Sequence, residues 1–273
     1  MKESFHKLTP ALWEAKKEKC RLMARNLLAR TFVAKPNDIN VEALAFEAGR
    51  LCIEEGGLHG ADGRLVADGQ NGGKIRVRSG MPLTRYRFTV AHEIGHCCLH
   101  AGGFIDRTDS GKTFGIWNDA SEEAEANVFA GELLLPNDLF IPRFRGKAPC
   151  IQLLESIAEE FQTSRLATAV QYIHYTKEVV ALVISKGWEI EWSRKTKEFY
   201  PAIRTGRISN DSAAGERLAA VRGDSGKMVL TPAYAWLEGY DGNPDKDIKE
   251  DSIYLDYYDR TITLLWWDDD DDE

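Results

Sequence analysis

Three histidines stand four residues apart in the segment RFTVAHEIGHCCLH, residues 87–100: His92, His96 and His100. Glu93 follows the first of them, which completes the pattern H-E-x-x-H. On a helix, residues four apart lie one turn apart on the same face, so His92 and His96 can reach one metal ion. A glutamate beside a ligand suits a general base better than a further ligand. The pattern predicts a zinc peptidase site; the alternative is a helix that carries histidines without a metal.

A catalytic zinc held by two histidines needs a third protein ligand and an open position for water. His100 is a poor candidate, because a rise of 1.5 Å per residue puts it roughly 12 Å along the helix from His92. Cys97 and Cys98 point off the metal face if the helix continues, and are expected to be small buried side chains. The remaining source of a ligand is the acidic segment SEEAEANVFAGELLLP, residues 121–136.

Within this acidic segment, Glu123 borders the apolar face that would pack on the histidine helix. Glu122 and Glu125 fall further round towards solvent, so Glu123 is the predicted third ligand. Asn127, four residues later on the same side, can hydrogen-bond the nitrogen of a zinc histidine that does not bind the metal. His100 is expected to be a wall, outer-sphere or substrate-contacting residue. The alternative for the whole segment is a solvated acidic helix face.

Capping residues and glycines predict the elements that position these groups. A first helix is expected from Thr9-Pro10 to about residue 31, and a second begins after Asn40 and is closed by Gly49. The histidine helix is expected over about 83–101, and the acidic helix from Ser121 to near Pro136. Short strands are expected at residues 50–55, 63–68 and 73–79, separated by glycine turns. A loop of about twenty residues is expected between the histidine helix and Ser121, and loops of that length are usually functional or mobile.

Residues 150–176 are predicted to form two short helices joined at Gln162-Thr163. They resemble a DNA-binding helix-turn-helix only superficially, because the second helix offers Arg165 as its single strong cation. We expect a helical pair packed on the core. From residue 178 the chain becomes β-rich, with strand-like segments at 178–185, 188–193, 252–258 and 261–267.

The predicted class is therefore α+β, with a gluzincin-like metallopeptidase core of helices and a small sheet. The expected organisation is a zinc metallopeptidase-like domain (1–145), the helical pair (146–177), a smaller β-rich accessory or recognition domain (178–267), and an acidic disordered tail (268–273). Recognition is assigned to the β-rich part because the predicted ligands and base all lie before Pro136, while five of the seven tryptophans lie in the β-rich part. The alternative is a self-contained packing module.

Composition narrows the function classes further. No apolar run approaches the eighteen residues of a membrane span, and the charged N-terminus lacks the apolar stretch of a signal peptide. Five scattered cysteines without a CxxC pair indicate reduced thiols and a cytoplasmic location. The net charge is −8, but the tail contributes −6, so the body carries −2 and direct nucleic-acid binding is not expected.

The segments INVEALAFEAG, RYRFTVAHEIGHCCLH and EEAEANVFAGELLLP together resemble the ImmA/IrrE family of metallopeptidases over residues 39–136. The resemblance implies that His92, His96 and Glu123 bind Zn²⁺ and that Glu93 is the catalytic base. The sequence departs from the family pattern at Cys97-Cys98, where apolar residues are usual, and at Gly131, where alanine is commoner. Residues 191–209 also resemble an accessory region of longer members.

The family implies a cytosolic endopeptidase that cleaves or regulates a transcriptional repressor, often a helix-turn-helix protein of a mobile element or stress response. The alternative is a non-catalytic zinc-containing module that binds and inactivates a partner, although a structural site would have no use for Glu93. The donor that stabilises the oxyanion stays open among His100, Tyr86 and Arg87. The oligomeric state is not predicted.

Overall fold

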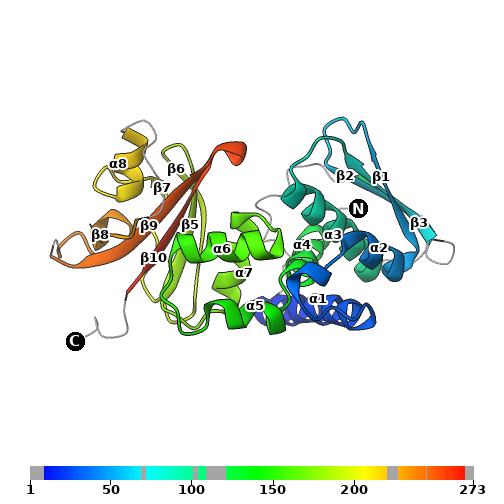
Figure 1. The fold of residues 1–273 in the computed structure, drawn as a ribbon. Helices are drawn as coiled ribbons and strands as arrows, with labels where there is room; N and C mark the ends of the chain where they lie inside the picture. Colours follow the sequence, from blue (N-terminus) through cyan, green and yellow to red (C-terminus); the bar gives the residue numbers. More distant parts are fainter. Residues whose placement is uncertain are drawn as a thin grey trace. The chain divides into compact units, whose positions relative to one another are not determined.

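The computed structural model describes residues 9–68, 72–100, 104–108, 121–219, 227–243 and 245–267. Their contacts group the chain into two compact units: Met1–Phe140 with Glu159–Ser164, and Ile141–Ala158 with Arg165–Glu273. Each unit contains helices and its own sheet (Figure 1), so the predicted α+β class is confirmed. The predicted domain limits at 145 and 177 stay predictions. The predicted acidic tail, 268–273, lies outside the described residues.

The first two helices begin at the predicted caps. Helix α1 spans Pro10–Arg30, with Thr9 accepting a hydrogen bond from the Leu12 amide, and α2 spans Val41–Gly49. The sequence suggested that Gly49 closes α2, but Gly49 is the last helical residue and Arg50 takes the left-handed conformation, at φ 52°. Gly49 has a packing reason, because a Cβ there would lie 3.0 Å from the Cys97 sulfur.

The sheet of the first unit has the strand order β1-β3-β2-β4. Its strands are β1 Leu51–Gly56, β2 Gly63–Asp68, β3 Gly72–Arg78 and β4 Phe104–Thr108. Strands β1 and β3 pair in parallel and the other pairs are antiparallel. Strand β4 corrects the expectation of a continuous loop after the histidine helix. It pairs with the edge of β2, a partner distant in sequence that local patterns do not reveal.

Helix α3, Leu83–His100, is the centre of the first unit (Figure 1). It packs against α2, against β2 and against α4, which spans Glu122–Leu134. Gly95 lets α4 approach, because a Cβ at that position would lie 3.2 Å from the Ala126 Cα and from a Phe129 ring carbon. The histidine helix is thus covered on several sides, and most of its middle turns are buried.

Three helices follow α4. Helix α5, Asn137–Phe144, was not predicted, because Pro142 lies inside it. Helices α6, Ile151–Phe161, and α7, Arg165–Tyr175, are the predicted helical pair, and Gln162 between them has φ 53°. All residues from Leu166 to Ile173 of α7 are buried, and this helix packs against β5 of its own unit. A buried helix offers little side-chain surface to a DNA groove.

An antiparallel six-stranded sheet forms the second unit, in the order β7-β6-β5-β10-β9-β8. Its strands are β5 Val180–Lys186, β6 Glu189–Lys195, β7 Gly206–Arg207, β8 Val229–Pro232, β9 Asp247–Leu255 and β10 Arg260–Trp266. Strands β7 and β8 and helix α8, Ala213–Ala219, were not predicted. The strand predicted at 252–258 ends at Leu255, and residues 256–258 form a 3₁₀ turn.

A buried cluster that includes Trp236, Phe199 and Leu265 forms the core beside this sheet. Glu250 is buried with it and accepts hydrogen bonds from the Trp236 indole at 2.8 Å and from the Ala214 amide at 2.8 Å. The Thr231 hydroxyl donates a further bond at 2.9 Å. These donors satisfy a carboxylate that would otherwise be costly to bury.

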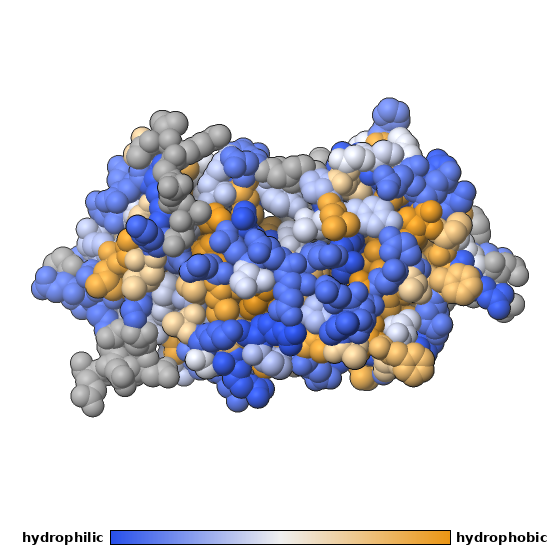
Figure 2. Space-filling view, in the orientation of Figure 1, coloured by the Kyte–Doolittle hydropathy of each residue, from blue (hydrophilic) through white to orange (hydrophobic). Residues whose placement is uncertain are grey.

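On the face in Figure 2, hydrophilic side chains predominate and hydrophobic ones form separate patches. None of the described helices is long and apolar enough to span a bilayer. All five cysteines carry free thiols.

Candidate metal centre

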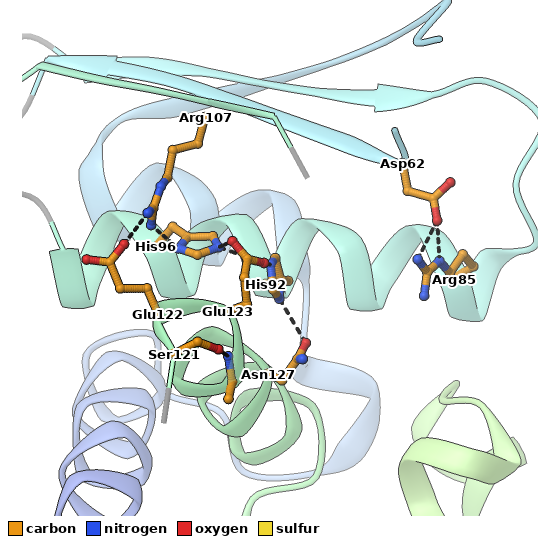
Figure 3. Close-up of polar contacts among 10 residues, drawn as sticks. Asp62, Arg85, His92, His96, Arg107, Ser121, Glu122, Glu123 and Asn127 are labelled. Carbon is orange, nitrogen blue, oxygen red and sulfur yellow. Dashed lines mark hydrogen bonds and ion pairs between the residues drawn. The ribbon is translucent and has the colours of Figure 1, made fainter. Parts of the chain in front are cut away.

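His92, His96 and Glu123 converge on one point (Figure 3). One ligand atom from each lies within 4.8 Å of the other two. The His92 Nε2 is 3.1 Å from the Glu123 Oε2 and 3.0 Å from the His96 Nε2, and the His96 Nε2 is 3.4 Å from the Glu123 Oε1. Among the described residues this is the one group of three or more such side chains with metal-binding geometry.

Two helices bring these three atoms together. His92 and His96 project from consecutive turns of α3, as their spacing predicts. Glu123 lies in the first turn of α4, where Ser121 caps the helix by accepting a hydrogen bond from the Ala124 amide at 3.2 Å. The cap fixes the start of α4, and Gly95 allows α4 to lie close to α3. The register of α4 therefore selects Glu123 to face the histidines.

Asn127 sets the orientation of His92. Its Oδ1 lies 3.0 Å from the His92 Nδ1, and both side chains are buried. An amide oxygen accepts the Nδ1 proton, so the Nε2 keeps a lone pair that points towards Glu123. His92 is thus held in the tautomer that a metal bound through Nε2 requires.

His96 has a different partner, Arg107 of β4. The Arg107 Nη1 lies 2.9 Å from the His96 Nδ1, and the Nη2 pairs with Glu122. A guanidinium only donates, so this contact suits the tautomer of His96 with its proton on Nε2. Metal binding through the His96 Nε2 places the proton on Nδ1, and Arg107 must then leave His96 and keep its contact with Glu122. The three residues fit a metal, with this one rearrangement.

Burial and charge set the protonation of the three residues. Burial lowers the pKa of His96 to about 4, so its ring is neutral at neutral pH. The adjacent imidazoles of His92 and His96 hold the pKa of Glu123 well below its ordinary range. Neutral imidazole and ionised carboxylate are the forms that bind a divalent cation.

Glu93, the residue that follows His92 in α3, is fully buried. Its carboxylate lies against Gly63, the first residue of β2, and a Cβ at position 63 would overlap the Glu93 Oε1. The same Cβ would lie 2.8 Å from the Thr89 Cγ2. The predicted base is thus held between its own helix and the start of a strand.

The other candidate residues lie outside the group of three. The His100 ring lies one turn beyond His96, with ring centroids 5.4 Å apart and the ring planes inclined at 47°. The Tyr86 hydroxyl donates to Glu42 of α2 at 2.9 Å, and the Arg87 Nη1 donates to the carbonyl of Ile39 at 3.0 Å. Those two side chains anchor α3 to the region of α2. Of the three residues considered for the oxyanion, only His100 adjoins the candidate ligands.

Sequence reasoning missed Arg107 and Gly63. Arg107 lies on a strand that was expected to be loop, so nothing in the sequence linked it to His96. Gly63 was noted only as a turn residue at the start of a predicted strand. The available signal was a glycine at the start of a strand-like segment, since glycine in a strand often marks a bulge, a bend or a close approach of another group.

Removal of the Asn127 amide tests how the histidine is held. Asn127→Ala is expected to weaken zinc binding by about 10–100-fold, because His92 loses the acceptor that fixes its tautomer. Competition with a chromophoric chelator measures the affinity. Asn137→Ala, at the start of α5, is a control of the same residue type, and equal losses in the two variants would refute the role of Asn127.

Comparison with known proteins agrees with this geometry. None of the curated proteins matches the chain in sequence. A solved structure called a Mycobacterium tuberculosis transcriptional regulator shares the fold with a TM-score of 0.54 at 12% identity, over 93% of this chain and 81% of that one. Residues 42–171 match the family described as IrrE N-terminal-like domain, Peptidase_M78. This segment contains α3, α4 and all four residues of the predicted site, so the chain has an IrrE N-terminal-like, Peptidase_M78 domain, which is the family that its motifs resemble.

Proposed function

We propose that this protein is a zinc-dependent endopeptidase of the gluzincin type. The observation that carries the proposal is the convergence of His92, His96 and Glu123 beside a buried Glu93, within a peptidase-family domain. Two histidines and one carboxylate are the protein ligands typical of a catalytic zinc, whereas a structural zinc usually has four protein ligands.

The residues of the candidate site have distinct parts in the proposed hydrolysis. Bound zinc would supply Lewis acidity, which lowers the pKa of water and polarises the scissile carbonyl. Glu93, as a carboxylate, accepts a proton from the attacking water and passes it to the departing amine. Asn127 holds His92 in the required tautomer, and Arg107 and His100 are the donors closest to the ligands for an oxyanion.

The proposed substrate is a transcriptional repressor of the helix-turn-helix type in the cytoplasm. The ImmA/IrrE family implies this class, and the similar fold of a protein called a transcriptional regulator is compatible with a role in gene regulation. The buried α7 and the near-neutral body support action on a protein rather than on DNA.

Cleavage of a purified repressor tests the function. The full chain, loaded with one equivalent of zinc, is incubated with a purified helix-turn-helix repressor. New termini found by mass spectrometry, absent with EDTA and restored by zinc, are the expected result. A repressor that is captured but stays intact would instead support the non-catalytic binding module.

The β-rich part from residue 178 is proposed to select this partner. Tyr200, Met228 and Leu230 are large apolar side chains that are 86%, 48% and 63% exposed there. Tyr200→Ser, and the pair Met228→Ser with Leu230→Ser, are expected to weaken repressor binding about 10-fold or more without loss of zinc. Phe46→Ser on α2, where the native side chain is 65% exposed, is the matched control. Equal binding by all variants in calorimetry would reject this role.

A further inference from the structure

Gly63 lies at the point where β2 meets the Glu93 carboxylate. A side chain there would overlap the Glu93 Oε1 and crowd the Thr89 Cγ2, both on α3. Gly63 does not have positive φ, so its backbone conformation is open to any residue. The need for glycine comes from the contact itself. The backbone of Gly63 is therefore the wall against which the Glu93 carboxylate rests.

A partly buried ionic cluster fixes the position of that wall. Asp62, which precedes Gly63, accepts hydrogen bonds from the Arg78 Nη2 at 2.8 Å and from the Arg85 Nε at 2.8 Å (Figure 3 shows the second pair). Arg78 ends β3, and its amide also donates to the Asp62 carbonyl at 2.9 Å. Arg85 lies in the first turn of α3 and is 4% exposed. The cluster ties β2 and β3 to the helix that carries Glu93.

The charge state of Asp62 supports a firm attachment. Burial opposes ionisation, but Arg85 and Arg78 hold the pKa of Asp62 below its ordinary value. Two guanidinium groups on one carboxylate also restrict its geometry more than a single point charge would. The start of β2 is consequently held in one place relative to α3.

We propose that Gly63, held by the Asp62–Arg78–Arg85 cluster, is a positioning residue that sets the direction of the Glu93 carboxylate. This inference rests on the proposed function, in which Glu93 must lie within hydrogen-bond reach of the reacting groups. A general base on a helix has several rotamers, and a wall on one side removes those that point away. A side chain at position 63 would push the carboxylate out of its place while leaving the three ligands untouched.

Acetohydroxamate binding to the zinc-loaded full chain tests the proposal without a substrate. Hydroxamates chelate zinc through two oxygens and offer a proton to a neighbouring carboxylate, so their affinity depends on Glu93. Gly63→Ala is expected to retain one zinc per chain and to bind acetohydroxamate about 10-fold more weakly, the effect of losing a hydrogen bond to a charged group. In the Glu93→Ala background, Gly63→Ala is expected to cause no further loss of acetohydroxamate affinity.

Two glycines serve as controls. A Cβ at Gly57 meets nothing within 4 Å, so Gly57→Ala should behave as wild type. A Cβ at Gly73 would lie 2.5 Å from the Val66 carbonyl oxygen and 2.7 Å from the Ala67 Cα, on the same sheet. Gly73→Ala should therefore lower the melting temperature and leave hydroxamate affinity unchanged. Arg85→Lys, which keeps the charge but not the two-pronged contact, is the second variant if Gly63→Ala does not fold, with an expected loss of about 3-fold.

The outcomes separate this inference from the proposed function. The positioning role is overturned if Gly63→Ala and Arg85→Lys bind acetohydroxamate as tightly as the wild type. It is also overturned if these changes weaken acetohydroxamate binding as much in the Glu93→Ala background as in the wild type. In both cases the peptidase proposal stands. If Glu93→Ala itself binds with wild-type affinity, or the wild type holds no zinc, the role of the base or the metal centre fails, and the inference fails with it.

Discussion

Glu93→Gln is expected to abolish proteolysis while the protein stays folded and zinc-loaded. The amide has nearly the shape of the carboxylate but cannot accept the proton of the attacking water. Loss of a general base typically costs about 10²–10⁴-fold in rate. Initial rates on the cognate repressor, with zinc content and circular dichroism measured on the same samples, give the comparison.

Burial makes this substitution informative. Glu93 is fully buried, so a change of size at this position would disturb packing, whereas glutamine preserves the volume. Replacing a buried carboxylate by a neutral amide also removes a desolvated charge, so no large loss of stability is expected. Glu125→Gln on α4, which only loosens the 2.6 Å pair with Lys16, is the control and should cleave normally. Wild-type cleavage by Glu93→Gln would rule out the mechanism.

Glu123→Ala is expected to lose the metal. Zinc affinity should fall by more than the roughly 10–100-fold that removal of an outer-sphere partner causes, because a direct ligand and a negative charge are lost together. Metal analysis after dialysis should show near-stoichiometric zinc in the wild type and little in the variant. Proteolysis should disappear with the metal.

Neighbouring glutamates of α4 provide the controls for Glu123. Glu122 pairs with Arg107 and Glu125 with Lys16, so each carboxylate already has a basic partner of its own. Glu122→Ala and Glu125→Ala should both keep zinc. Full zinc content in Glu123→Ala, with a loss in Glu122→Ala, Glu125→Ala or His100→Ala, would move the third ligand to that position.

Local sequence was sufficient for the parts of the site that depend on one helix. The four-residue spacing of His92 and His96 dictates a shared face as soon as the segment is helical. Ser121 predicted the start of α4, and the caps at Thr9 and Asn40 predicted α1 and α2. Helical order arises between residues a few positions apart, so a short window of sequence contains the information.

Tertiary structure decided the remaining features of the site. Strand β4 exists because β2 offers it an edge, and only this pairing brings Arg107 to His96, eleven positions away in sequence. The contact of Gly63 with Glu93 joins a strand to a helix thirty residues later. The small strands β7 and β8 likewise depend on neighbours in the second sheet. Strand pairing and close approach are set by partners distant in sequence, so residue order alone predicted the candidate ligands and the candidate base but not the groups that surround them.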